Sequence, residues 1–371
     1  MYTDTQFLND LLKLLKQPTL TTNKPALQTV VEAITREIKQ IPELSVEVFE
    51  KDGALSLLAY AGQVRPRSFK VLLNGHLDVV PAKDDQFTPQ TKGSKLYARG
   101  ALDMKTASLV FIKLFVELAP KLPYSLGLQL VTDEEMGGHN GTCHQLATQD
   151  IHAEFVLGGE MTQGDINNSS KGICWASLQS TGTTAHSAYL WQGQNAVINL
   201  SDQIRTVLSD YPVPPEEAWV TTVNVAMLGT DNQTVNRVPD TASATLDIRF
   251  VPDDPNFQSK QTALEYLGDM FPGAKVAITQ FEAGHVCKTD NPFVRRLVAS
   301  CEQVTGKKPA FIKKHGTSDL RFYAEHHIPS VNFGLSGDNI HGDGEYLDLR
   351  SLEPYRKTVK HFLQSLNEHE F

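Results

Sequence analysis

The feature that most constrains the fold of this sequence is a series of short apolar segments, each followed closely by a histidine or a carboxylate. These are residues 71–73 followed by His76, residues 125–131 followed by Glu134 and Glu135, and residues 155–157 followed by Glu160. Apolar runs of this length that end in turn residues are typical of buried strands. The polar residues are therefore expected at the ends of neighbouring strands.

Helical segments separate these strands. Residues 106–118 have helical periodicity, and prolines at 120 and 123 close the helix. Further helices are expected at residues 291–305 and 352–366. Strands alternating with helices predict an α/β fold with a mixed, mostly parallel sheet and helices on both faces. In such sheets, ligands bind beyond the carboxyl ends of the strands.

The residues expected at this edge are suited to holding metal ions. Two neighbouring dications need imidazoles, several carboxylates and one shared ligand. The set is His76, Asp103, Glu135, Glu160 and one later histidine. Asp103, at a loop-to-helix junction, is the expected shared ligand because its short side chain is positioned by the backbone. Asp78 is placed to accept the second N–H of His76 and so to fix its tautomer.

Glu134 and Glu135 are expected to have different roles. Neighbours in an extended segment point to opposite sides, so one can bind metal while the other faces substrate. A glutamate beside a metal-activated water can act as its general base and then pass the proton to a departing amine. Taken singly, each motif has an ordinary explanation as a surface pair or a solvated acid. Their order along the chain favours a shared site.

The middle of the chain follows a different pattern. Strands at 175–180, 221–228, 241–250 and 275–281 alternate with helices at 195–208 and 256–271. The order β-α-β-β-α-β is that of a ferredoxin-like sandwich. We therefore expect an α/β domain formed by residues 1–174 and 286–371, with an α+β domain inserted at residues 175–285.

Composition narrows the class of partner. The 40% hydrophobic and 21% charged residues are typical of a soluble globular protein, and the net charge of −9 argues against nucleic acid or an anionic membrane as partner. No segment has the roughly 20 apolar residues of a membrane span. The N-terminus lacks a signal-peptide pattern, and the four cysteines are scattered, so a cytoplasmic location is expected.

Together these motifs resemble the dizinc aminoacylase/carboxypeptidase metallopeptidase superfamily, which includes succinyl-diaminopimelate desuccinylase, acetylornithine deacetylase and aminoacylase. The resemblance covers nearly the whole chain. It is carried by His76-Leu77-Asp78, Gly100-Ala101-Leu102-Asp103-Met104-Lys105, Asp133-Glu134-Glu135, Gly159-Glu160 and His341, the last in a His-x-x-x-Glu-Tyr segment. Ala101 and Leu102 occupy positions that vary in the family and carry little information.

The resemblance implies two Zn²⁺ ions per subunit, for which Co²⁺ or Mn²⁺ can substitute. His76 and Glu160 would bind one ion, Glu135 and His341 the other, and Asp103 would bridge them. Glu134 would be the general base and acid. The additional histidines His139 and His144 follow Glu135 and are expected to be exposed.

The resemblance also implies roles for residues outside the metal site. The inserted domain would be a lid that usually forms homodimers, and His186 would reach a substrate oxyanion, often in the partner's active site. The implied substrate-binding residues are Asn236, Arg249, Gly316, Thr317 and Ser318. Arg249 suits a substrate carboxylate through paired hydrogen bonds, or is a surface charge at a strand end. Residues 316–319 could instead form only a helix N-cap.

These expectations lead to a cytoplasmic zinc amidohydrolase of amino-acid biosynthesis that removes a succinyl or acetyl group from an N-acyl amino acid. The alternative is a dipeptidase or carboxypeptidase of the same superfamily, because both use the same attack on an amide. A non-catalytic metal-binding module is a different class, against which the presence of Glu134 argues. A metal-independent α/β hydrolase is disfavoured because the sequence has no Gly-x-Ser-x-Gly motif.

Overall fold

The computed structural model describes residues 4–367, which fall into two compact units. The larger unit comprises the described residues up to Asn168, Val286–Ile312, and those from Ser318 onward. The smaller unit comprises Ser169–His285 and Lys313–Thr317. The smaller unit thus starts a few residues before the predicted boundary and also takes in a short segment from the C-terminal part of the chain.

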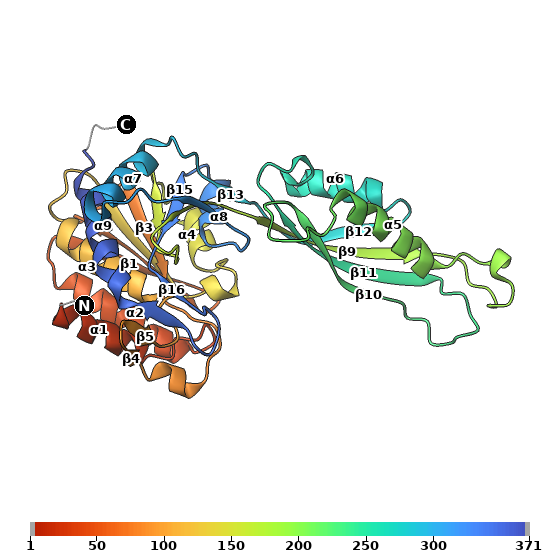
Figure 1. The fold of residues 1–371 in the computed structure, drawn as a ribbon, viewed down its shortest axis with the longest axis horizontal. Coiled ribbons are helices and arrows are strands. Elements are labelled where there is room, and N and C mark those ends of the chain that lie inside the picture. The colour runs from red at the N-terminus through yellow and green to blue at the C-terminus, as the bar shows by residue number, and fades with distance from the viewer. Residues whose placement is uncertain (1–3, 368–371) are drawn as a thin grey trace. The chain divides into compact units, whose positions relative to one another are not determined.

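The larger unit is built on a mixed sheet with a parallel centre (Figure 1). Its strands lie in the order β1-β2-β6-β3-β7-β15-β8-β13, with β14 paired to β8. The bounds are β1 (Leu44–Lys51), β2 (Ala54–Ala61), β3 (Val71–His76), β6 (Leu126–Val131), β7 (Val156–Gly158), β8 (Ile166–Ser170), β13 (His285–Val286), β14 (Phe311–Lys314) and β15 (Ser330–Phe333). Strands β6, β3, β7 and β15 run parallel, whereas β1, β2 and β8 are antiparallel to their neighbours.

Alternating side chains of the central strands bury both faces of this sheet. On β3, Val71 and Leu73 join one apolar cluster, whereas Leu72 joins another on the opposite face. Near-continuous apolar strands are what a sheet covered on both faces requires. The predicted α/β fold with helices on both faces is therefore confirmed.

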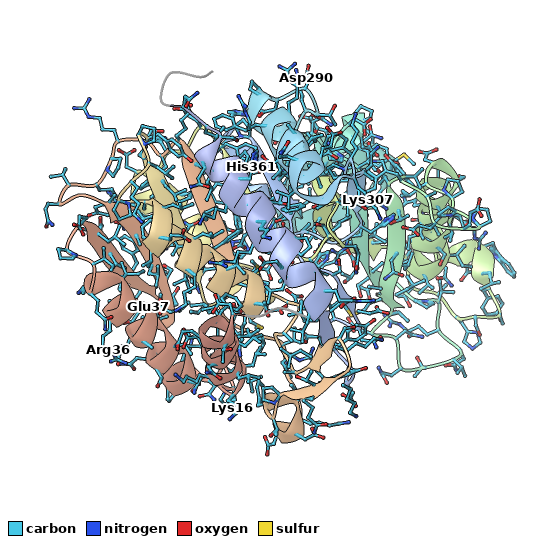
Figure 2. All side chains as sticks on the ribbon, turned by 60° about the vertical axis from the view of Figure 1, so that its left-hand side comes forward. Lys16, Arg36, Glu37, Asp290, Lys307 and His361 are labelled. Carbon is cyan, nitrogen blue, oxygen red and sulfur yellow. The ribbon has the colours of Figure 1, made fainter. Side chains whose placement is uncertain are left out.

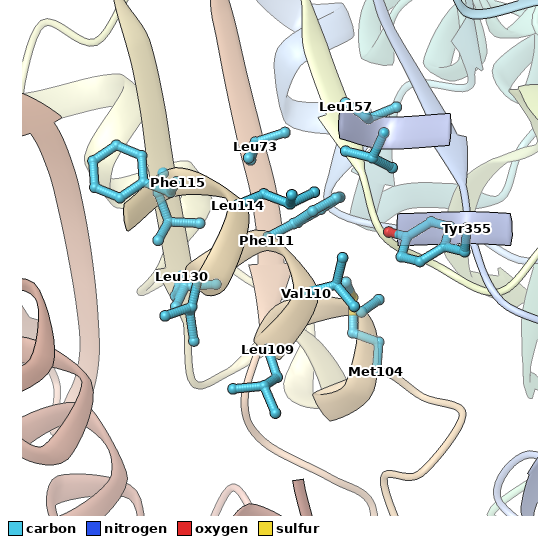
Figure 3. Close-up of a cluster of buried hydrophobic side chains, with 14 of the residues drawn as sticks. Leu73, Met104, Leu109, Val110, Phe111, Leu114, Phe115, Leu130, Leu157 and Tyr355 are labelled. Carbon is cyan, nitrogen blue, oxygen red and sulfur yellow. The ribbon is translucent and has the colours of Figure 1, made fainter. Parts of the chain in front are cut away.

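One face of the sheet carries the larger helices. These are α1 (Thr5–Leu15), α2 (Lys24–Lys39), α3 (Lys105–Leu118), α7 (Pro292–Thr305) and α9 (Leu352–Gln364). Figure 3 shows α3 at the centre of this cluster, with Phe111 and Phe115 among strand residues such as Leu73 and Leu130. Charged residues occupy the outer surface, among them Arg36 and Glu37 of α2 (Figure 2). The other face is covered by α4 (Thr142–Thr148) and α8 (Leu320–Glu325).

A small antiparallel sheet completes the larger unit. Its order is β16 (Gly337–Asp338), β17 (Tyr346–Asp348), β5 (Lys95–Tyr97) and β4 (Gln90–Lys92). It joins the segment before Asp103 to the segment after His341, because β5 pairs with β17. Two expected metal ligands that are far apart in sequence are thereby anchored to one sheet.

The smaller unit has the predicted β-α-β-β-α-β order. Its elements are β9 (Gly172–Thr181), α5 (Ala196–Asp210), β10 (Thr222–Gly229), β11 (Thr241–Phe250), α6 (Lys260–Met270) and β12 (Lys275–Glu282). The sheet order β10-β11-β9-β12 is entirely antiparallel. Both helices pack on one face of the sheet through a single apolar cluster (Figure 1). Alternate residues of β9, such as Trp175, are exposed on the other face.

Candidate metal centre and active site

His76 is the last residue of β3, and its side chain is buried. Its Nδ1 lies 2.9 Å from the backbone carbonyl oxygen of Asp78. With Nδ1 donating to that carbonyl, Nε2 keeps its lone pair and faces two carboxylates. It is 3.1 Å from Asp103 Oδ1 and 3.7 Å from Glu160 Oε1.

Asp103 lies between two histidines. It precedes α3 in the chain, and its Oδ1 faces His76 while its Oδ2 lies 3.2 Å from His341 Nε2. The same His341 nitrogen is 3.3 Å from Glu135 Oε2. The structure thus brings together all five residues that the sequence marked as metal ligands, with the aspartate in the middle.

The spacing of these atoms fits a metal ion. Ligand atoms of His76, Asp103 and Glu135 lie within 4.8 Å of one another, as do those of His76, Glu134 and Glu160. Zinc binds nitrogen and carboxylate oxygen at about 2.0–2.2 Å, so tetrahedral ligands lie about 3.4 Å apart. The observed separations of 3.1–3.7 Å between facing donors match that edge length. The donor set therefore fits divalent metal ions, and the two ligand groups have His76 in common.

The electrostatics of the site also favour cations. Burial acts to lower the pKa of His76, but hydrogen bonds to Asp103 and Asp78 outweigh it and hold this pKa well above the usual value. Hydrogen bonds to Asp103 and Glu135 raise the pKa of His341 to about 10. The surrounding carboxylates thus stabilise positive charge at both histidines, and a bound dication supplies that charge in place of protons.

Asp78 faces His76 with two of its oxygen atoms. Its carbonyl oxygen is the close partner of His76, whereas its carboxylate Oδ1 is 3.5 Å from Nδ1. The carboxylate also accepts the backbone N–H groups of Glu134 and Glu135, at 3.3 and 3.2 Å. Asp78 therefore connects the end of β3 to the turn that holds the two glutamates.

Glu134 and Glu135 open a 3-10 turn, Glu134–Met136, and the extended segment predicted for them is wrong. Backbone hydrogen bonding to Asp78 and a left-handed Gly137 (φ 98°) favour the turn. The two carboxylates still belong to different ligand groups. Burial raises the pKa of Glu134 well above its usual value, and the charge of Glu160 adds to the rise. A carboxyl group with a raised pKa is suited to general acid–base chemistry.

Sequence reasoning missed the residues that hold the Asp103 loop. The carboxylate of Glu345 accepts hydrogen bonds from Arg99 Nη1 (2.7 Å) and from the backbone N–H groups of Gly100 (3.1 Å), Leu102 (2.9 Å) and Asp103 (3.2 Å). Arg99 also donates to the carbonyl of Gly342, 3.1 Å away. Both side chains of this ion pair are almost fully buried. The glutamate of the His-x-x-x-Glu-Tyr segment was the available signal.

The remaining predicted residues are divided between the two units. Ser318 is buried in the larger unit, where its Oγ accepts from Asn332 Nδ2 at 3.1 Å. Gly316, Thr317, His186, Asn236 and Arg249 belong to the smaller unit. Within it, the backbone N–H of Ser187 donates to the carbonyl of Asn236 at 3.0 Å, which places the His186 and Asn236 segments side by side.

His186 is exposed and has a defined tautomer. The backbone N–H of Ala188 donates to its Nδ1 at 3.1 Å, so the proton of the neutral ring is on Nε2. Nε2 is therefore available as a hydrogen-bond donor.

The two histidines that follow Glu135 lie apart from the expected metal ligands. His139 contacts the ring of Phe322, and His144 lies on α4 beside Thr148. Neither belongs to a ligand group within residues 4–367.

Taken together, the α/β sheet, the clustered histidines and carboxylates, and the half-buried Glu134 beside them define a metal-dependent hydrolase. The model of peptidase family M20/M25/M40 matches residues 72–365, so the chain belongs to this family. Enzymes of this family depend on a dinuclear metal site and hydrolyse amide bonds. The expected superfamily and enzyme class are confirmed.

Relatives and solved structures agree with this family. The chain is 32% identical over 287 residues to a putative succinyl-diaminopimelate desuccinylase DapE of Mycobacterium tuberculosis, covering 74% of this chain and 76% of that protein. It is 28% identical to the Helicobacter pylori succinyl-diaminopimelate desuccinylase, covering 79% and 80%. Its fold resembles the aminopeptidase PepT of Bacillus cereus (TM-score 0.75, 17% identity, 98% of each chain). It also resembles the metallo-carboxypeptidase Sso-CP2 of Sulfolobus solfataricus (TM-score 0.71, 19% identity, 98% and 99%).

Among the helices of the described residues, none combines the length and apolar composition needed to cross a bilayer.

Proposed function

We propose that the protein is a dizinc deacylase that removes a succinyl or acetyl group from an N-acyl amino acid. The observation that carries the proposal is the position of Asp103 between His76 and His341, with Glu135 and Glu160 at the outer positions and Glu134 beside them. The two desuccinylase relatives support a deacylase rather than a peptidase.

In this proposal His76 and Glu160 would hold one zinc ion, Glu135 and His341 would hold the other, and Asp103 would be a ligand of both. Zinc, when bound, supplies a Lewis acid that polarises the amide carbonyl and makes water more acidic. Co²⁺ or Mn²⁺ would fit the same ligands, which are nitrogen and oxygen donors.

Glu134 moves the proton in the reaction. It takes a proton from the attacking water as the water oxygen bonds to the acyl carbon. It then donates that proton to the amide nitrogen as the C–N bond breaks, which releases the acid and a free amine. The raised pKa of Glu134 suits both steps, because the group must hold the proton between them.

The smaller unit supplies groups that bind substrate in this proposal. His186, with its proton on Nε2, donates to the oxyanion that forms at the acyl carbon. Asn236, Gly316, Thr317 and Ser318 would contact the substrate. Association through the smaller unit would make the active enzyme a homodimer. A cytoplasmic location agrees with the four free cysteines, and sedimentation of the purified protein tests the dimer.

A substrate panel tests the proposed reaction. The zinc-loaded enzyme should hydrolyse N-succinyl or N-acetyl amino acids faster than dipeptides and tripeptides with the same amino acids. The alternative is a dipeptidase or carboxypeptidase, to which the family description also applies. Turnover of peptides without deacylation would establish that alternative and refute the deacylase.

A further inference from the structure

Asp319 is a buried carboxylate of the larger unit that does not cap the helix it precedes. It occupies the N-cap position of α8, but among the described residues that helix receives no capping hydrogen bond from its side chain. The residue is only 3% exposed. Buried carboxylates are rare unless they are paired or hydrogen-bonded. The presence of this one must therefore be explained by what it contacts outside α8.

The carboxylate is directed to the segment that follows Glu134. Its Oδ2 accepts a hydrogen bond from Thr142 Oγ1 at 2.5 Å, at the start of α4. Its Oδ1 lies against Gly138, because a Cβ added to that glycine would be 2.1 Å from this oxygen. One carboxylate thus contacts both ends of the segment 138–142.

A second side chain from the same turn, Arg321, holds this segment as well. Its Nη2 donates to the carbonyl of Gly137 at 2.6 Å. The N–H of Gly137 in turn donates to the carbonyl of Glu134 at 2.8 Å. The N–H of Gly138 donates to the carbonyl of Asp133, also at 2.8 Å. The contacts made from the start of α8 therefore reach Glu134 and its neighbour through backbone hydrogen bonds.

The segment after Glu134 needs this support because it is rich in glycine. Gly137 and Gly138 both have left-handed backbones, with φ of 98° and 65°, and Gly141 follows. Glycine restricts the backbone least of all residues, so the segment alone does not fix the position of Glu134. A displacement of about 1 Å at a reacting group can cost about 100-fold in rate. The position of the Glu134 carboxylate therefore depends on contacts from outside the segment.

Thr142 extends these contacts to the strand that carries His76. Asn74 lies two residues before His76 on β3, and its Nδ2 is 3.4 Å from Thr142 Oγ1. The same Nδ2 donates to Gln129 Oε1 of β6 at 3.0 Å. All of these side chains are buried. Asp319 is thus linked through one hydroxyl to the strand that carries a metal ligand as well as to the segment after Glu134.

We propose that Asp319 is a positioning residue for Glu134. Through its contacts with Thr142 and Gly138 it fixes the segment after the turn, which keeps the Glu134 carboxylate where the attacking water gives up its proton. This inference rests on the role of Glu134 in the proposed function and extends that function to a residue that acts through others. The proton moves in the transition state and not when substrate binds. Loss of Asp319 should therefore lower kcat and leave KM nearly unchanged.

Steady-state kinetics of variants at positions 319 and 142 test the inference. The assay uses whichever amide the wild-type enzyme cleaves at saturating Zn²⁺, an N-acyl amino acid or a dipeptide. Asp319→Ala should lower kcat by about 100-fold and change KM by less than about 3-fold. Thr142→Val removes the hydroxyl and should lower kcat by about 10-fold, whereas Thr142→Ser keeps it and should stay within about 2-fold of wild type. The Thr142 pair decides the question even if Asp319→Ala fails to fold.

A residue that does cap its helix is the matched control. Asp4 caps α1 of the same unit and accepts the backbone N–H of Phe7 at 3.0 Å. Asp4→Ala should lower the melting temperature, because the cap is lost, and leave kcat unchanged. Hydrogen–deuterium exchange adds a measurement that needs no activity. Asp319→Ala should speed the exchange of backbone amides in residues 134–143, and Asp4→Ala should not.

Three outcomes would overturn the inference: wild-type kcat in Thr142→Val, equal losses in Thr142→Val and Thr142→Ser, or unchanged exchange of residues 134–143 in Asp319→Ala. A rise in KM alone would assign Asp319 to substrate binding and would overturn it as well. Failure of the proposed function shows separately. If the wild type cleaves only peptides, the deacylase is refuted while the kinetic test proceeds on the peptide. If it cleaves no amide, the exchange measurement still decides whether Asp319 holds the segment.

Discussion

Replacing Glu345 by Gln should destabilise the larger unit through the loop that carries Asp103. Glu345 accepts four hydrogen bonds, one from Arg99 and three from backbone N–H groups of residues 100–103. Gln can keep one oxygen toward Leu102 and Asp103. Its NH₂ group would then face the donors of Arg99 and Gly100, and the guanidinium would lose its counter-charge.

The size of the effect follows from burial. The side chains of Arg99 and Glu345 are 2% and 1% exposed, so water cannot replace the lost partner. Removing one member of a buried pair costs about 3–5 kcal/mol. We therefore expect Glu345→Gln to lower the free energy of unfolding of the larger unit by about that amount. Metal affinity should also fall, because the loop that positions Asp103 loses its anchor.

The placement of the tryptophans allows this effect to be localised. All three, Trp175, Trp191 and Trp219, belong to the smaller unit. Denaturant unfolding after chelation should show the change in far-UV circular dichroism but not in tryptophan fluorescence. As a control, Asp348→Asn removes the ion-pair partner of the exposed Arg350. It should leave the unfolding midpoints unchanged in both circular dichroism and tryptophan fluorescence.

A double-mutant cycle supplies the decisive comparison. If the two side chains act as a pair, Arg99→Met combined with Glu345→Met should cost less than the sum of the two single variants, because neither charge is then left buried alone. Additive costs, or a loss below about 1 kcal/mol for Glu345→Gln, would refute the reasoning. A shift confined to tryptophan fluorescence would refute the assignment to the larger unit.

Three further predictions concern the turn after β6 and its surroundings. Glu134→Ala should lose turnover by several orders of magnitude yet keep its zinc by elemental analysis, and an active variant would exclude Glu134 as the base. Gly138→Ala should lower the free energy of unfolding by more than about 2 kcal/mol, because φ of Gly138 is 65° and the added Cβ would lie 2.1 Å from Asp319 Oδ1. The matched control Gly93→Ala has a similar φ of 63° but open space around the added Cβ, so it should lower the free energy of unfolding by only about 1–2 kcal/mol. Burial raises the pKa of Asp319 to about 6 from 3.8, so after chelation its contribution to stability should fall by at most about 3 kcal/mol as the pH rises from about 4 to 6. Asp319→Asn should remove that fall, and parallel pH profiles for variant and wild type would contradict it.

Much of the fold could be predicted from the sequence because its periodic segments are long. The helix expected at 106–118 is α3 (Lys105–Leu118), and the strand expected at 241–250 is β11 (Thr241–Phe250). The hairpin of β1 and β2 and the helix α2 were not identified. Strand β1 does alternate apolar and polar residues at 44–48, so its signal was present but short and was overlooked. Strand β2 is apolar throughout its centre and lacks the alternation that marks a half-buried strand.

The ligand set of the candidate site could be proposed from sequence because each ligand follows a recognisable strand or motif. The backbone geometry of the site could not be predicted from the sequence. His341 has a left-handed backbone with φ 61°, a conformation that side chains other than glycine rarely adopt and that depends on the surrounding loop. The pairing of Arg99 with Glu345 spans 246 positions, and no local pattern encodes such a contact. The engagement of Arg249 by Asp247 depends on side-chain rotamers, which spacing does not determine.

The sheet order of the larger unit has a consequence for how the chain is made. Strand β15 lies between β7 and β8, although both precede it in sequence and almost all of the smaller unit lies between β8 and β15 along the chain. During synthesis, β7 and β8 emerge with a missing strand between them, and α9 follows later still. The larger unit therefore cannot close its sheet until the C-terminal segment leaves the ribosome, whereas the strands and helices of the smaller unit are already complete. We expect nascent chains that stop before β15 to contain a folded smaller unit beside an open sheet, a state that chaperones recognise by its exposed apolar strands.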